Sequence, residues 1–295
     1  MRASGPRLLP LPPLLLLLMV TALFPRRGLS LQKDSVKKDF YTWWDNGDPP
    51  TYDDPVFIKW MLEEHNRFRA MVDPPAADML HMTWDLKLSE IAKAYVEKCV
   101  FGHNPDLGNP HKLHPVFKVV GENIWLGPPG TLIVASESWY NETRFYTYST
   151  QACSEVCGHY TQLVWANSYK LGCAAHVCNR VPGFEEEFLM MVICNYGPAG
   201  NFPSHPYVSG IPCSSCIAED TCENNLCNNP ERDTIDLPVG TGRDSEGSEG
   251  REVIEDIKSG RTEEDVSKAS LPLDHPLLHV LLFNCCYTLL YLVYQ

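Results

Sequence analysis

FLMMVICNY, residues 188–196, is an almost continuous apolar run. A run of this length predicts a strand that is covered on both faces, because neither face is reserved for polar side chains. Two earlier stretches also read as strands, HYTQLVW from His159 and GCAAHVC from Gly172. Short turns separate the three segments, so together they predict a sheet.

Helical patterns come before the strands. Asp54-Pro55 reads as an N-cap followed by proline at the first helical position, and apolar side chains then recur at helical spacing until Pro74. A second helix follows Asp85, and a third spans roughly residues 132–145. Helices first and strands later predict an α+β fold in which helices sandwich an antiparallel sheet.

Charge and cysteine usage exclude several classes of protein. The 295 residues contain 24 Lys and Arg against 37 Asp and Glu, a net charge of −13, which argues against a nucleic-acid partner. Residues 231–270 hold twelve acidic and six basic side chains and predict a flexible acidic stalk. Ten of the twelve cysteines fall between Cys99 and Cys227, a density typical of exported rather than cytosolic proteins.

Both ends of the chain carry targeting patterns. Residues 1–30 predict a secretory signal peptide, with an uncleaved signal anchor as the alternative. Residues 271–295 are mostly apolar, lack a basic flank and predict a glycosylphosphatidylinositol (GPI) attachment signal, with a weak membrane span as the alternative. The small residues that could carry the anchor are Ala269, Ser270, Ser259 and Gly260.

Four motifs occur in a fixed order: HNRFR at 65–69, GENI at 121–124, GHYTQLVWANS at 158–168 and CNYGPAGN at 194–201. Together they resemble the CAP superfamily (cysteine-rich secretory proteins, antigen 5, pathogenesis-related 1), and further stretches resemble its glioma pathogenesis-related 1-like subgroup. The resemblance implies an α-β-α sandwich over residues 56–205, followed by a small disulfide-stapled hinge over residues 206–230.

The cysteine pairing is also taken from this resemblance, since spacing alone permits many connectivities. The implied pairs are Cys99–Cys178, Cys173–Cys194, Cys153–Cys157, Cys213–Cys222 and Cys216–Cys227. A zinc site formed by the last four cysteines is the alternative for the hinge.

The resemblance implies a tetrad of two histidines and two glutamates, His103, Glu122, Glu142 and His159. Helical phase supports one member independently: Glu142 shares the inward stripe of Leu132, Ala135 and Trp139, and a carboxylate there needs a partner. Asn141 faces the opposite way and starts an Asn-Glu-Thr sequon, so we expect it to be glycosylated. Imidazole and carboxylate suit Zn²⁺ or a similar divalent ion, although no cofactor is required.

These observations favour a non-catalytic, GPI-anchored glycoprotein on the outer face of the plasma membrane. Neither HExxH nor GxSxG occurs, and the core cysteines are assigned to bridges. His65 and Arg69 are expected to satisfy core hydrogen bonds. The resemblance implies cell–cell or protein recognition, with cell-surface proteins of a gamete complex in sperm–egg binding as partners. The alternatives are a divalent-metal hydrolase or protease using the tetrad, and a sterol- or lipid-binding protein.

Overall fold

The computed structural model describes residues 49–236 of the chain. By internal contacts the chain divides into two units, residues 1–243 and 244–295, and every described residue belongs to the first. The predicted signal peptide, the anchor candidates at 259–260 and 269–270, and the apolar tail 271–295 lie outside the described residues. Within residues 49–236, every helix is too short or too polar to cross a membrane.

Two predicted helices are confirmed together with their caps. Helix α3, Pro55–Ala70, begins after Asp54, whose Oδ1 accepts a hydrogen bond from the Val56 amide at 2.8 Å. Helix α4, Leu86–Val96, begins after Asp85, whose carboxylate accepts from the Leu88 amide at 2.8 Å. Each carboxylate satisfies an amide that the first helical turn leaves without a partner.

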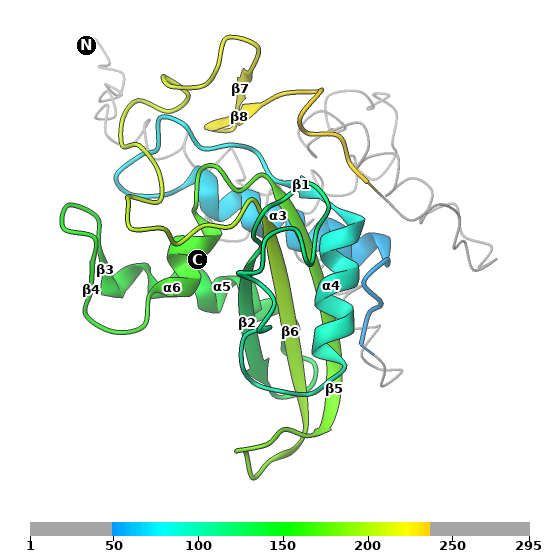
Figure 1. The fold of residues 1–295 in the computed structure, drawn as a ribbon. Coiled ribbons are helices and arrows are strands. Elements are labelled where there is room, and N and C mark those ends of the chain that lie inside the picture. Colours follow the sequence, from blue (N-terminus) through cyan, green and yellow to red (C-terminus); the bar gives the residue numbers. More distant parts are fainter. Residues whose placement is uncertain (1–48, 237–295) are drawn as a thin grey trace, which may run out of the picture. The chain divides into compact units, whose positions relative to one another are not determined.

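The central sheet has four strands in the order β1-β5-β6-β2 (Figure 1). These strands are β1 (Thr83–Trp84), β2 (Gly121–Gly127), β5 (Lys170–Arg180) and β6 (Glu187–Gly197). Strand β1 runs parallel to β5, and the other neighbours are antiparallel. The apolar run at 188–196 is β6, and its residues 189–197 are all buried, as expected for a strand covered on both faces.

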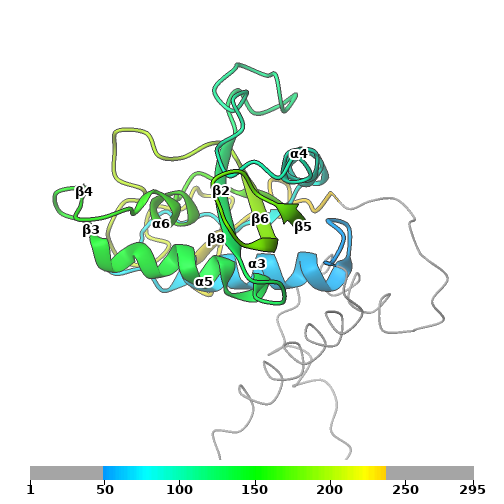
Figure 2. The ribbon, with the colours of Figure 1, turned by 90° about the horizontal axis from the view of Figure 1, so that it is seen from below.

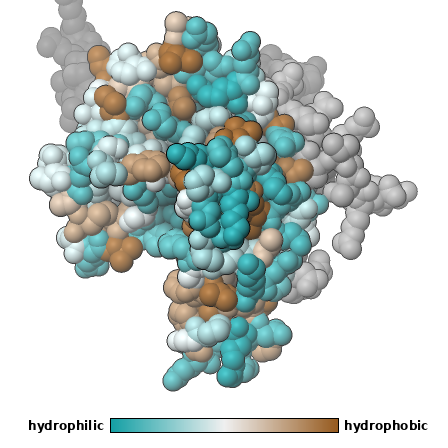
Figure 3. Space-filling view, in the orientation of Figure 1, coloured by the Kyte–Doolittle hydropathy of each residue, from teal (hydrophilic) through white to brown (hydrophobic). Residues whose placement is uncertain are grey.

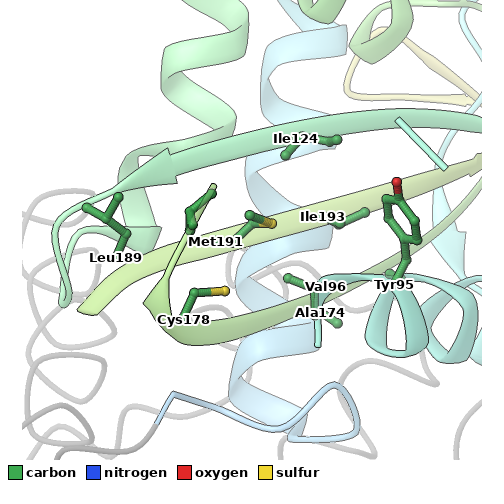
Figure 4. Packing of buried hydrophobic residues seen from close by; sticks show 10 residues of the cluster. Tyr95, Val96, Ile124, Ala174, Cys178, Leu189, Met191 and Ile193 are labelled. Atoms are coloured by element: carbon green, nitrogen blue, oxygen red, sulfur yellow. The ribbon is translucent and has the colours of Figure 1, made fainter. Parts of the chain in front are cut away.

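Figure 2 shows the helices on both sides of the sheet, α4 against one face and α3 with α5 against the other. On the α4 side, the apolar side chains of α4 pack against those of β2, β5 and β6 (Figure 4). Gly172 in β5 allows the closest approach, because a Cβ atom there would lie 2.1 Å from the Ser89 amide nitrogen. The predicted α-β-α sandwich is confirmed.

The third predicted helix, 132–145, is broken into 3₁₀, α and 3₁₀ segments, and the strand predicted from His159 is wrong. Residues 158–163 form the short helix α6, in which Tyr160 and Leu163, one turn apart, are both buried. This segment and its surroundings comprise η1 (Leu132–Val134), α5 (Ala135–Tyr140), η2 (Asn141–Phe145), β3 (Tyr146–Thr147), β4 (Ala152–Cys153) and α6 (Gly158–Leu163).

Within residues 49–236, ten cysteines form five disulfides, and the pairs are those that the CAP resemblance implies: Cys99–Cys178, Cys153–Cys157, Cys173–Cys194, Cys213–Cys222 and Cys216–Cys227. Four hinge cysteines are therefore bonded to one another, which leaves no thiolates for the alternative zinc site. The hinge contains a hairpin of β7 (Thr221–Glu223) and β8 (Leu226–Asn228).

The hinge lies against the sandwich. The Cys227 amide donates to the Met79 carbonyl at 2.8 Å, and the His81 amide donates to the Cys227 carbonyl at 3.0 Å. The first residues of the predicted stalk are folded too, because the Asp236 amide donates to the Trp84 carbonyl at 3.2 Å and Lys170 donates to the Thr234 carbonyl. The folded part thus extends past the predicted boundary at residue 231.

Candidate functional site

The first half of the tetrad is a pair formed by Glu122 and His103. Strand β2 holds Glu122 with its side chain fully buried. Its Oε1 accepts from His103 Nδ1 and from the Asn104 amide, both at 3.0 Å, and its Oε2 accepts from Asn195 Nδ2 at 3.4 Å. His103 is 61% exposed, and its hydrogen bond to Glu122 raises the pKa of the imidazole.

The second half pairs Glu142 with His159. Glu142 Oε1 lies 2.6 Å from His159 Nδ1, and Oε2 accepts from the backbone amides of His159 at 3.0 Å and Tyr160 at 3.2 Å. These two amides belong to the first turn of α6, where helical amides lack partners within the helix. Glu142 therefore caps α6 from another element and orients the imidazole of His159.

Asn123 joins the two pairs through the core. It follows Glu122 in β2, and its Nδ2 donates to the His159 carbonyl at 2.9 Å and to the Tyr196 hydroxyl at 3.1 Å. The Tyr196 hydroxyl in turn lies 2.9 Å from His65 Nε2. Asn123 lies inside the GENI motif and Tyr196 inside the CNYGPAGN motif, but no local pattern in the sequence marks either residue as part of the site.

His65 and Arg69 fill the core, as expected. His65 is fully buried, its Nδ1 lies 2.7 Å from the Met61 carbonyl, and burial lowers its pKa to about 4. Arg69 is 1% exposed and donates five hydrogen bonds to carbonyl oxygens. The acceptors are the carbonyl groups of Leu80, Leu163, Trp165 and Ala166.

The histidines of both pairs have the orientation of metal ligands. In each ring, Nδ1 faces a glutamate, so Nε2 is the nitrogen available to a ligand. A carboxylate behind an imidazole is the usual outer-shell partner of a metal-binding histidine, because it fixes the tautomer and raises ring basicity. Each of these histidines could therefore offer Nε2 to a divalent ion, which would act as a Lewis acid toward a bound ligand.

Compact groups of three possible metal ligands occur elsewhere in residues 49–236. They are Cys99, His176 and Cys178, and Cys216, Asp220 and Cys227, with ligand atoms within 4.8 Å of one another. Each group contains disulfide-bonded cysteines, which offer no thiolate to a metal. The tetrad residues are not among these compact groups within residues 49–236.

Asn141, the predicted glycosylation site, begins η2 and has an exposed side chain. Its neighbour Glu142 is half-buried and lies against His159, whereas Asn141 is exposed to solvent.

Residues 62–196 match the cysteine-rich secretory protein family, CAP. The chain is 49% identical to the glioma pathogenesis-related protein 1 of Mus musculus over 61% of this chain and 67% of that protein. It is also 49% identical to the GLIPR1-like protein 1 of Bos taurus, over 62% of this chain and 76% of that protein. The crystal structure of NaASP2 with Zn²⁺ is 28% identical and covers 62% of this chain and 98% of its own, with a TM-score of 0.47. The chain belongs to the cysteine-rich secretory protein family.

Proposed function

We propose that this chain is a non-catalytic CAP glycoprotein that acts by recognition at the outer face of the plasma membrane. It enters the secretory pathway, keeps a GPI anchor and binds cell-surface proteins, with a gamete-surface complex in sperm–egg binding as the setting. Its likeness to glioma pathogenesis-related and GLIPR1-like proteins supports export, and the apolar terminal run supports the anchor.

One observation carries the non-catalytic part: both tetrad carboxylates already serve as hydrogen-bond acceptors that hold the fold. Glu122 is fully buried and accepts from three donors, and Glu142 accepts from one imidazole and two backbone amides. A general base must reach a substrate proton directly or through one water. These carboxylates instead position the imidazoles of His103 and His159, so on the exposed face of the tetrad the imidazole nitrogens, and not the carboxylates, are the groups that can meet a ligand or ion.

Anchoring and recognition are tested on cells. Phosphatidylinositol-specific phospholipase C should release the protein from intact expressing cells, and full retention would contradict the GPI anchor.

The released chain, labelled with a fluorophore, should bind oocytes saturably, and an excess of unlabelled chain should displace it. Binding that neither saturates nor competes would contradict the recognition function.

The metal-dependent hydrolase is the competing function and has its own test. Full-length protein would be incubated with Zn²⁺ and peptide or ester substrates, beside the double variant Glu122→Gln with Glu142→Gln. Glu137→Gln is the matched control, because Glu137 is exposed on α5 and takes no part in the hydrogen bonds of either pair. We expect no turnover by any chain. Turnover lost in the double variant and kept in Glu137→Gln would overturn the non-catalytic assignment.

A further inference from the structure

An exposed apolar surface lies at the far end of the sheet, where the hairpin of β5 and β6 turns. Phe184 lies in the turn, and its ring meets that of Phe101 edge to face, with centroids 5.3 Å apart. Val100, Phe101, Phe184 and Phe188 are 44%, 48%, 38% and 56% exposed, and we call these four residues the hairpin surface. Figure 3 shows apolar side chains among polar ones at this projecting end.

The hairpin surface is held in place by the fold. The Cys99–Cys178 disulfide ties the residue before Val100 to strand β5, so the segment after α4 stays beside the hairpin. Beneath the surface, Val181 and Leu189 are buried in the core. Phe188 has φ +57°, a left-handed conformation that costs a bulky residue about 1–2 kcal/mol. Phe188 adopts this conformation between Glu187 and Leu189, both of which pair with strand β5, and its ring remains exposed to solvent.

Three consecutive glutamates, 185–187, separate Phe184 from Phe188, and all three are exposed. Glu187 pairs with Arg180 at 3.0 Å, whereas Glu185 and Glu186 form no ion pair within the described part of the chain. This negative charge repels anionic lipid headgroups and also a second copy of the same surface. It favours a partner that carries cationic side chains around an apolar centre.

We propose that the hairpin surface is a docking site for a protein segment in which lysine or arginine side chains flank large apolar ones. Exposed apolar patches rimmed by charge mark protein-binding sites, and aromatic side chains dominate the energetics of such interfaces. The inference rests on the proposed recognition function and assigns that function to a surface distinct from the tetrad.

The probe is a fluorescein-labelled peptide of alternating lysine and leucine with one tryptophan, and its counterpart with glutamate in place of lysine. Anisotropy titrations with the full chain should show saturable binding of the lysine peptide only. Phe184→Ala should weaken binding by about tenfold. Glu185→Gln with Glu186→Gln should reduce the salt dependence of binding. Ile211→Ala is the matched control, because Ile211 is 78% exposed and lies in the hinge.

Equal binding of the glutamate peptide, or unchanged binding by Phe184→Ala, would overturn the docking site, and so would preferential binding to phosphatidylserine vesicles. The oocyte assay separates this inference from the proposed function. If Phe184→Ala chains bind oocytes as the natural chain does, recognition stands and the hairpin surface is refuted. If no chain binds oocytes while the peptides are discriminated, the recognition function fails and the docking chemistry stands.

Discussion

His65 makes the stability of the fold depend on pH. Burial lowers its folded-state pKa to about 4 from the ordinary 6.5, so the folded protein resists a proton that the unfolded chain accepts. The contribution of the neutral His65 to the free energy of unfolding is present above pH 6.5 and is lost as the pH falls toward 4. At about 1.4 kcal/mol per pKa unit, lowering the pH from 7.5 to 5 removes about 2 kcal/mol through His65 alone.

The variant His65→Gln isolates this contribution. A glutamine amide can donate to the Met61 carbonyl and accept from the Tyr196 hydroxyl, the two partners of the imidazole, and it does not titrate. Free energies of unfolding from urea titrations at pH 7.5 and pH 5 should show that the natural chain loses about 2 kcal/mol more than the variant on acidification.

Two other groups also have shifted pKa values, but their contributions to the free energy of unfolding cancel when the natural chain is compared with His65→Gln. Burial raises the pKa of Asp54 to about 6, which adds stability on acidification, and lowers that of His81 to about 4, which removes it. Both act in the natural chain and in the variant alike. His111→Gln is the control, because it replaces an exposed histidine by the same residue and leaves the buried core untouched. Equal losses in the natural chain and in His65→Gln would refute the reasoning.

Three further predictions concern packing and pairing. Gly172→Ala should lower the free energy of unfolding by about 1–3 kcal/mol, since its Cβ would meet the backbone of α4, whereas Gly108→Ala has nothing within 4 Å and should be neutral. Arg69→Lys should lower the melting temperature, because three donors replace five and each carbonyl left without a partner costs about 1–3 kcal/mol. Glu122→Gln should lower the pKa of His103 in an NMR titration, because a neutral amide stabilises the imidazolium less; an unchanged pKa would contradict the pairing.

The sequence predicted those elements whose signals lie in consecutive residues. The Asp54 and Asp85 caps and the long apolar run of β6 are each contained in a short stretch of the chain. Helix α6 differs from the predicted strand because its first turn is capped by the side chain of Glu142, which belongs to another segment. The residues next to His159 give no sign of that contact.

In the candidate site, too, the sequence predicts the residues but not the contacts that depend on the sheet. The motif resemblance identified the four tetrad residues, and the helical phase of Glu142 pointed to its inward orientation. The contact of each glutamate with its own histidine could not be predicted. Glu122, for example, lies beside His103 because of the position that β2 takes in the sheet beside β6. The link through Asn123 depends on the same register, which brings it to the hydroxyl of Tyr196 on the neighbouring strand.

The contacts between the hinge and the sandwich affect which recombinant fragments of this protein keep the native packing. A recombinant fragment that ends at residue 205, the predicted end of the sandwich, would leave the Met79 carbonyl without the Cys227 amide and Trp84 without the Asp236 amide. Leu226, which is 2% exposed, would also be missing from the interior. A fragment that runs to Asp236 keeps these contacts, so binding lost on cutting at residue 205 can report a destabilised sandwich as well as removal of a binding module.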